Sequence, residues 1–496
     1  MQCRNLRDWI AEIDRAGELK RVNAEVDWDL ELSSISRRVI KQEGPALLFE
    51  NIKDHQRTAC RKLFINGLGT QERVAMALGL PRDTSNQAMI EFIKGGLDKR
   101  IDPVKVASGS VKENIIKGDA INLYEFPVPK WAPLDGGRFI NTYAATVTMD
   151  PDTKIMNVGM YRGMIGDDKR SIPVLLVRSQ HWGTHLSKYE QRGEEMPVAV
   201  VFGYDPLLLL LAASPISHPG YSEYDLVGGL RGGPVDLVKC ETSDLYVPAS
   251  AEIVIEGRVS PDTKTFQMEG PYGEYPGFYA GVAQPKPTIR VDCITHRDDP
   301  IFRGGIVGIT PDGNRSESYY WVMLMYSAVI RRALENSGIP GILGVWGSRT
   351  TSFTNLRIQI DKTYRGQAKQ VAAALWGLGG STILGKNLVV VDRDIDIFND
   401  EAVEWAIAYR TNATMGAFQF FPGAPCHTLD PSLPISERDE LKYGAGKWTR
   451  VLIDATVNWD LEPQEQYGGR REPPLCTVIP PEIDELLDRR WLEYGL

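Results

Sequence analysis

Apolar side chains at helical spacing begin the chain and predict an amphipathic helix. Four of them share one face of that helix: Leu6, Trp9, Ile10 and Ile13. Gly17 follows the last of these positions and favours the end of the helix there. Two short apolar runs, 46–49 and 62–65, are typical of strands, and residues 72–78 are typical of a second helix. This mixture predicts a small α/β domain over residues 1–115.

The pattern changes to strands between residues 116 and 310. Five segments there are rich in Val, Ile, Thr and aromatic residues, with Gly, Pro and Asp between them: 142–149, 172–177, 197–202, 251–256 and 288–295. Helical patterns are few in this part of the chain, apart from 183–192 and 207–213. We therefore predict a β-rich middle domain over residues 116–310, with a barrel as its candidate form.

Helices and strands alternate again from residue 311 onward. Helical periodicity marks residues 319–336, 368–378 and 402–408, and apolar strand patterns mark 387–391 and 450–457. The alternation predicts a third, α/β domain over residues 311–496, so the whole chain is expected to be a multidomain α+β protein. The tail from Pro480 onward fits a helix with proline in its first turn.

Composition narrows the classes of function that the chain can serve. Hydrophobic residues make up 43% of it and the net charge is −9, without a Lys/Arg-rich run, which argues against nucleic-acid binding and against a polybasic membrane anchor. The longest apolar run, 207–213, is too short to cross a bilayer. Six scattered cysteines without CxxC spacing, and a charged N-terminus that lacks a targeting pattern, predict free thiols in a cytoplasmic protein.

One short stretch, Glu269-Gly270-Pro271-Tyr272-Gly273-Glu274, holds two carboxylates five residues apart. On a helix or a straight strand at this spacing the two side chains would point apart. They converge only if the backbone turns between them, and the Gly-Pro pair and the second Gly are residues that favour a turn. Two carboxylates held together can divide into an acid and an anionic anchor. A solvated turn that happens to hold two acids is the structural alternative.

Two nucleotide-like patterns fail on their details. Residues 67–72 begin like a dinucleotide fingerprint, but Glu72 stands where the third Gly should be, which favours a tight strand-to-helix turn. Residues 380–386 resemble a phosphate-binding loop, yet Asn387 replaces the Ser or Thr, and a helix precedes the loop where a strand is required. Lys386 nevertheless offers a cation that could meet an anion.

Asn, His and Glu side chains in four stretches offer mixed oxygen and nitrogen donors for a divalent ion such as Mn²⁺ or Mg²⁺: 156–162, 180–181, 214–223 and 244–257. Each of them, taken singly, also fits a structural role. His181 and His185 have the spacing of zinc ligands on one helix face, but the Glu of the HExxH pattern is missing. Because strict alternation would set Asn157 and Arg162 on opposite faces of a strand, a shared site requires a bulge near Gly159.

Long segments of the sequence, in this order, resemble the UbiD-type decarboxylase family: PVPKWAPLDGGRFINTY (127–143), VDLVKC (235–240), DLYVPASAEIVIEG (244–257), EGPYGEYPG (269–277) and VVVDRDIDI (389–397). The resemblance runs over nearly the whole chain. It implies a split β-barrel that binds flavin in the middle domain, between N-terminal and C-terminal α/β domains. The cofactor that it implies is prenylated FMN, held through Mn²⁺ or Mg²⁺ with K⁺ nearby.

The resemblance also assigns site residues, position by position. It implies that Asn157, His181 and Glu223 bind the divalent metal. The residues expected to contact the cofactor are Asn157, Val158, Gly159, Met160, Tyr161, Arg162, Gln180, His181, Glu223 and Lys386. Potassium would lie near Ala212, Ala213, Pro215 and Glu223, although Ala213 and Pro215 depart from other members. Substrate-pocket candidates are Ile306, Phe420, Phe421 and His427.

For this chain the resemblance implies reversible, non-oxidative decarboxylation with Arg162, Glu269 and Glu274 as catalytic residues. Arg162 would bind the substrate carboxylate in its guanidinium fork, Glu269 would hold that guanidinium, and Glu274 would act as acid and base. The flat faces of Phe420 and Phe421 favour an aromatic or heteroaromatic acid, of hydroxybenzoate, indole or pyrrole type.

Two alternatives stay open, a decarboxylase of cinnamate-like α,β-unsaturated acids and a flavin-binding reductase. The expected partners are the small acid and CO₂, a flavin prenyltransferase that supplies the cofactor, and further copies of the chain in a homodimer or homohexamer formed through the C-terminal domain. Neither nucleic acid nor membrane is expected as a partner.

Overall fold

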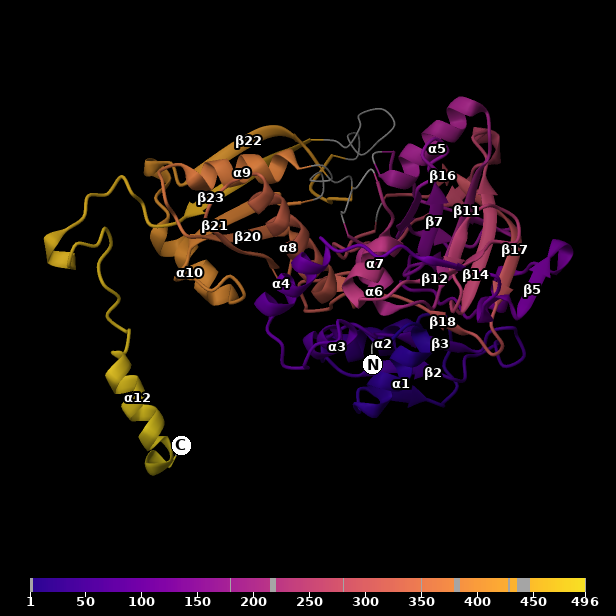
Figure 1. Ribbon diagram of the computed structural model, residues 1–496, viewed down its shortest axis with the longest axis horizontal. Coiled ribbons are helices and arrows are strands. Elements are labelled where there is room, and N and C mark those ends of the chain that lie inside the picture. The colour runs from indigo at the N-terminus through magenta and orange to yellow at the C-terminus, as the bar shows by residue number, and fades with distance from the viewer. Residues whose placement is uncertain are drawn as a thin grey trace.

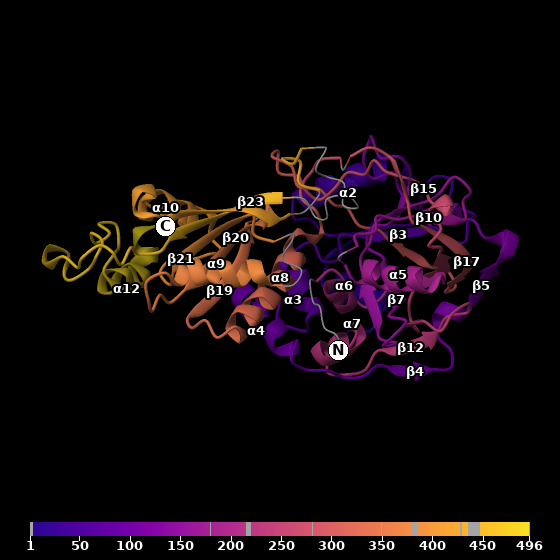
Figure 2. The same ribbon diagram turned by 90° about the horizontal axis from the view of Figure 1, so that it is seen from above.

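The computed structural model describes residues 3–178, 180–214, 220–279, 281–348, 350–378, 384–426, 429–434 and 447–495. The C-terminal sheet forms one lobe, and the N-terminal and middle parts of the chain form the other (Figures 1 and 2). Within the described part of the chain, we find no helix long and apolar enough to cross a membrane.

The N-terminal part is a small sheet with helices. The sheet has the order β1-β2-β3-β18, from Leu19–Val22, Ala46–Phe49, Lys62–Ile65 and Ile301–Arg303. The helices are α1 (Leu6–Arg15), α2 (Glu31–Lys41), α3 (Gln71–Ala77) and α4 (Asn86–Gly96). The apolar face predicted for α1 is buried, and Thr70 caps α3 right after the expected tight turn. The pattern did not reveal that a strand from residues 301–303 completes this sheet.

The middle part is built on an antiparallel sheet of seven strands. Its order is β10-β17-β14-β11-β7-β8, and β5 also pairs with β17. These strands are β5 (Asn114–Lys117), β7 (Ala145–Met149), β8 (Met156–Gly159), β10 (Ser171–Pro173), β11 (Met196–Phe202), β14 (Ile253–Val259) and β17 (Thr288–His296). The pairings confirm a β-rich region, whereas the split β-barrel stays a prediction.

Smaller elements surround this sheet and position the site. They are the pairs β6–β9 (Phe139–Asn141, Gly163–Met164) and β15–β16 (Gln267–Glu269, Gln284–Lys286), the group β4–β12–β13 (Val104–Val106, Asp236–Lys239, Tyr246–Pro248), and helices α5 (His181–Arg192), α6 (Pro206–Ala212) and α7 (Glu223–Arg231). Two predicted strands are shorter than expected. The first begins at Ala145. The second ends at Pro173, a residue without a backbone donor.

The C-terminal part is a five-stranded sheet in the order β19-β20-β21-β23-β22 (Ile342–Ser348, Ser352–Ile360, Asn387–Asp392, Lys447–Ala455 and Phe418–Pro425). β20, β21 and β23 are parallel, and the two edge strands are antiparallel to their neighbours. Helices α8 (Ser318–Asn336), α9 (Gln367–Gly377) and α10 (Asp400–Arg410) confirm the predicted alternation. The chain then leaves the lobe as an extended arm that ends in α12 (Pro481–Arg490) (Figure 1).

Candidate active site

The turn predicted between the two carboxylates is present. β15 ends at Glu269, and Gly270 takes a positive φ of 92°, which glycine adopts without steric cost. The chain passes through a cis Gly270-Pro271 peptide and reaches Glu274, whose N–H donates to the carbonyl of Phe278 (2.9 Å). The backbone therefore reverses between the two acids, and both side chains meet Arg162.

Arg162 forms a buried ion-pair triad with the two glutamates. Its Nε and Nη2 donate to the two carboxylate oxygens of Glu269, at 2.8 and 3.0 Å, and its Nη1 donates to Glu274 Oε1. Glu269 is 1% exposed and Glu274 is 9% exposed. Burial disfavours the charge of Arg162, but the carboxylates of Glu274 and Glu269 outweigh that effect and raise its pKa. The guanidinium is therefore cationic and held in one orientation.

Arg162 reaches this position because β8 stops early, and not through the bulge that we expected. β7 and β8 pair in regular register as far as Gly159, and the chain then leaves the sheet before β9. A Cβ at Gly159 would collide with the ring of Tyr161, so glycine leaves room for that ring to fold back. The ring stacks on Trp182 with centroids 4.9 Å apart. Because β8 ends at Gly159, the alternation of side chains between the two faces of the sheet stops there. Arg162 is therefore not forced to the face opposite Asn157.

The three predicted metal ligands line one cavity of about 340 Å³. Asn157 Nδ2 donates to the Tyr161 hydroxyl (3.3 Å), so its Oδ1 faces His181 Nδ1 at 2.8 Å. Because an amide oxygen only accepts, the Nδ1 of His181 donates to it here, and the two atoms that face each other are an oxygen and a nitrogen of the kinds that bind divalent metals.

Glu223 comes to the same cavity from the start of α7. Ser222 caps this helix, and Asp225 completes a capping box. Burial raises the pKa of Glu223 to about 7, and the Val158 N–H donates to its Oε2 at 2.7 Å. Among the described residues, no cationic side chain forms an ion pair with Glu223, and no group of three His, Cys, Asp or Glu side chains stands ready for a metal. An Asn-His-Glu set lies outside that grouping, and its donors suit a hard or borderline cation.

The remaining residues of the predicted cofactor and potassium sites are placed as follows. Met160 donates its N–H to the carbonyl of Ala212 at 3.2 Å, which links the segment before Arg162 to the end of α6. Ala213 is the C-cap of that helix, and Gln180 is the N-cap of α5. Pro215 lies outside the described residues. The potassium site stays a prediction.

Lys386 lines a different cavity, of about 230 Å³. Tyr275 and Pro276, the two residues that follow Glu274 in the sequence, also line this cavity. Its Nζ donates to Asp430 Oδ2 and to the Ser432 hydroxyl, both at 2.8 Å. This cavity joins the carboxylate turn to the C-terminal sheet. The structure thus brings Lys386 near the turn, away from the residues that line the Asn157 cavity.

The predicted substrate-wall residues do not gather in this structure. Phe420 is 66% exposed on β22, and Phe421 packs edge-on against Trp376 with centroids 4.5 Å apart. Neither lines the cavity next to Tyr275. Ile306 is buried, and its carbonyl accepts the Tyr143 hydroxyl. His427 lies outside the described residues.

The sequence did not single out Tyr272, although it stands between the two glutamates. The Arg162 guanidinium lies over its ring, 5.3 Å from the centroid, and Phe139 packs against it at 4.3 Å. This contact adds a cation–π attraction to the triad. Its position inside the EGPYGE stretch was the available signal.

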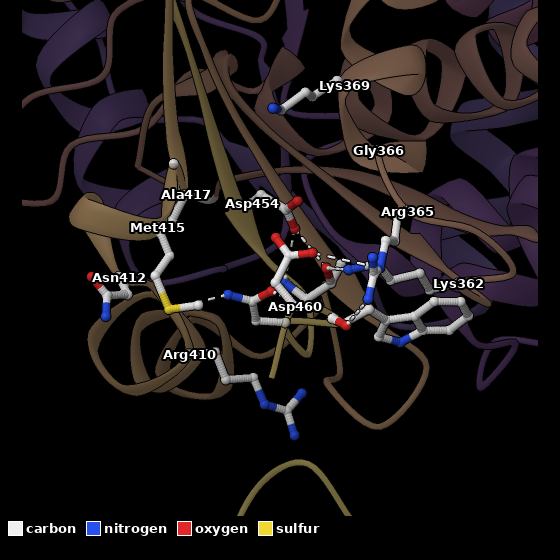
Figure 3. Close-up of a pocket in the computed structure, with 14 residues that line it drawn as sticks. Lys362, Arg365, Gly366, Lys369, Arg410, Asn412, Met415, Ala417, Asp454 and Asp460 are labelled. Atoms are coloured by element: carbon white, nitrogen blue, oxygen red, sulfur yellow. Dashed lines mark hydrogen bonds and ion pairs between the residues drawn. The ribbon is translucent and has the colours of Figure 1, made fainter. Parts of the chain in front are cut away.

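A further pocket, of about 100 Å³, lies at the carboxyl ends of β20 and β23 (Figure 3). Several basic side chains line it, but most of their donors have partners. Lys362 donates to the Thr456 hydroxyl and to the carbonyl of Val457, both at 2.8 Å. Arg410 pairs with Asp394, and Arg365 lies 3.5 Å from Asp460. We therefore do not place the active site there.

Comparison with known proteins gives three matches in chain order. The 3-octaprenyl-4-hydroxybenzoate carboxy-lyase N-terminal domain matches residues 10–93, its Rift-related domain matches 103–310, and its C-terminal domain matches 319–455. A pyrrole-2-carboxylic acid decarboxylase of Pseudomonas aeruginosa is 29% identical over 99% of this chain and 98% of its own length.

Two solved structures share the fold over almost their full lengths. The vanillic acid decarboxylase of Sedimentibacter hydroxybenzoicus, in its closed form, is 30% identical with a TM-score of 0.86, over 100% of this chain and 99% of that chain. HmfF from Pelotomaculum thermopropionicum, a UbiD-class enzyme in complex with FMN, is 29% identical with a TM-score of 0.80, over 98% of this chain and 99% of that chain. The chain therefore belongs to the UbiD family of prenylated-FMN-dependent carboxy-lyases.

Proposed function

We propose that this enzyme decarboxylates an aromatic or heteroaromatic carboxylic acid, reversibly and without oxidation. The observation that supports it best is the buried triad of Arg162, Glu269 and Glu274, which sets a guanidinium and a carboxylate side by side, one residue before the cavity-lining Tyr275. Relatives over the whole chain act on pyrrole-2-carboxylic acid and on vanillic acid, which are flat aryl acids. A hydroxybenzoate, pyrrole or indole acid is therefore the substrate class that we favour.

Arg162 is proposed to bind the substrate carboxylate. Glu269 occupies Nε and Nη2, so the edge of the guanidinium that carries Nη1 is the one that turns toward Glu274. A substrate carboxylate that takes the Nη1 donor would release Glu274 from the ion pair. Binding of the substrate and freeing of the acid/base group would then be the same event.

Glu274 is proposed to carry the proton. When the C–C bond to the carboxylate breaks, CO₂ leaves and an electron pair stays on the substrate carbon. A proton must then bond to that carbon for the product to form. Glu274 would be a carboxylate while CO₂ departs, would take up a proton from water, and would then give that proton to the carbon; in the reverse direction its carboxylate would remove the proton. Glu274 is 9% exposed, so bulk water has little access to its carboxyl group.

The cofactor fits the chemistry of the residues present. Prenylated FMN, when bound, would supply an electrophilic carbon able to accept the electron pair. Asn157, His181 and Glu223 would hold a Mn²⁺ or Mg²⁺ ion, because they bring an amide oxygen, an imidazole nitrogen and a buried carboxylate to one cavity. A divalent cation would also offset the cost of burying Glu223 without a cationic partner.

We further propose that the enzyme acts as a homodimer or homohexamer, with a flavin prenyltransferase as its cofactor supplier. The C-terminal arm supports association between copies. α12 has ten residues and none of them is buried, while Ile483 and Leu492 stand exposed on it or just beyond it. Because an isolated helix of this length is marginal in water, the arm requires a surface to cover it.

The experiment is CO₂ release from a panel of acids. The enzyme is produced together with a flavin prenyltransferase, and its flavin absorbance is recorded before hydroxybenzoate, pyrrole, indole and cinnamate acids are tested. Glu274→Gln should keep the flavin absorbance and lose turnover, whereas Glu195→Gln, at an exposed position, should keep both. Turnover of the cinnamate acid alone would contradict the substrate class, and full activity of Glu274→Gln would contradict the assigned proton carrier.

A further inference from the structure

A second stretch of chain forms hydrogen bonds to the backbone of the turn between Glu269 and Glu274. Residues 132–136, Ala-Pro-Leu-Asp-Gly, lie against residues 270–274, although more than 130 positions separate them in the sequence. We call residues 132–136 the clamp segment. Its contacts reach the backbone of the turn, and Arg162 contacts the turn through the side chains of Glu269 and Glu274.

Asp135 holds the end of the turn that leads to Glu274. Its Oδ1 accepts the N–H of Gly273 at 2.9 Å, and its Oδ2 accepts the N–H of Ala132, also at 2.9 Å. The residue is 6% exposed. One carboxylate therefore ties the Tyr272–Gly273 peptide to the start of the clamp segment, and both of its oxygens are used.

Gly136 holds the other end of the turn. Its N–H donates to the carbonyl of Pro271 at 2.9 Å. A Cβ at this position would overlap the carbonyl of Gly270, so a glycine is required for the two backbones to approach. The two hydrogen bonds bracket Tyr272, whose ring supports the Arg162 guanidinium.

We propose that Asp135 and Gly136 are positioning residues, which set the distance between the Glu274 carboxylate and Arg162 by fixing the backbone on both sides of Tyr272. The proposal rests on the proposed function of Arg162 and Glu274. The reason is geometric, because Glu269 is anchored in β15, whereas Glu274 follows a turn in which Gly270 and Gly273 give the backbone added freedom. Without the clamp segment, the second carboxylate could drift while the first stays on Arg162.

The charges around Asp135 suit this role. Burial raises its pKa to about 6, and the N–H groups of Gly273 and Ala132 limit that rise, as do the positive charges of Arg37 on α2 and of Lys130. At pH 7.5 the group is therefore mostly a carboxylate, which accepts on both oxygens. Asparagine has the same shape but only one acceptor oxygen, so Asp135→Asn can keep only one of the two bonds.

The test compares three variants in the cofactor-loaded enzyme. Asp135→Ala removes both bonds, Asp135→Asn removes one, and Glu256→Gln is the matched control. Glu256 is also buried and accepts two backbone N–H groups, those of Glu241 and Thr242 at 2.8 Å, but on a loop away from the turn. A misplacement of about 1 Å can lower turnover roughly 100-fold. We expect a kcat loss of that order for Asp135→Ala, a smaller loss for Asp135→Asn, and none for Glu256→Gln, with KM and flavin absorbance unchanged.

A second readout does not depend on activity. Hydrogen exchange of the peptide that spans residues 268–279 should quicken in Asp135→Ala and Asp135→Asn, both with and without cofactor, and stay at the parental rate in Glu256→Gln. Parental kcat and parental exchange in the Asp135 variants would overturn the proposal, as would equal kcat losses in all three. If Glu274→Gln keeps full turnover, the proposed function fails instead, so the two failures are distinguishable.

Discussion

The substitution Arg162→Lys tests the centre of the site most directly. Lysine keeps the positive charge but loses the planar fork that now donates to both oxygens of Glu269 and to Glu274. At best one ammonium donor can replace one arm of that arrangement. The buried carboxylate of Glu269 would then lack at least one charge-assisted hydrogen bond, and the substrate carboxylate would lose the oriented Nη1 donor.

The size of the effect follows from these contacts. A hydrogen bond to a charged group contributes about 1.5–3 kcal/mol, so losing one or two of them costs about 3 kcal/mol. Because about 1.4 kcal/mol corresponds to a tenfold change in rate, we expect kcat/KM to fall roughly 100-fold. The fold should survive, since the charge that balances Glu269 and Glu274 remains.

The assay is the initial rate of CO₂ release from the best acid of the panel, compared at equal cofactor loading. Arg290→Lys is the control, because Arg290 pairs with Glu195 and Asp292 but its side chain is 64% exposed. That variant should keep the parental rate. If Arg162→Lys stays within about threefold of the parent at equal flavin content, the fork is not what binds the substrate, and the reasoning is refuted.

Three further outcomes follow from the structure. His181→Ala should lower both the metal content and the flavin content of the purified enzyme, measured by elemental analysis and absorbance; unchanged contents would contradict the metal site. Burial, aided by Arg138, lowers the pKa of His55 to about 4, and because Arg138 can only donate, the His55 Nε2 at 3.1 Å must stay unprotonated. His55 therefore contributes stability above pH 6.5 that is lost as the pH falls toward 4, up to about 3 kcal/mol, and His55→Gln should flatten this part of the urea-unfolding profile; a profile as steep as the parent's would contradict it. Removal of residues 472–496 should reduce the number of chains per assembly, measured by light scattering, with little change in the unfolding temperature. An unchanged number of chains would count against the arm as the contact between copies.

The fold could be predicted in large part from the chain itself. Periodicity located α1, α8, α9 and β21 close to their observed bounds. These elements bury one face or a whole apolar run, so apolar residues occupy their buried positions in the sequence. The strand Ile301–Arg303 was missed, since three residues are too short for a period, and they join the N-terminal sheet only through tertiary contact. The strand pattern suggested a barrel and the family resemblance implied a split one, which stays a prediction, because strand patterns do not reveal which edges meet.

The candidate site divides in the same way. The glycines and proline between Glu269 and Glu274 determined that the chain turns there, because few other residues allow it. The family resemblance paired Arg162 with Glu269 and His181 with Asn157, but the residue pattern alone did not. Only the tertiary structure decided that Arg162 also contacts Glu274 and that Asp135 holds Gly273, because these residues lie far apart in the sequence. The expected bulge at Gly159 was wrong for the same reason. Local pattern records the conformations open to each residue, whereas the packing of distant segments selects which side chains meet.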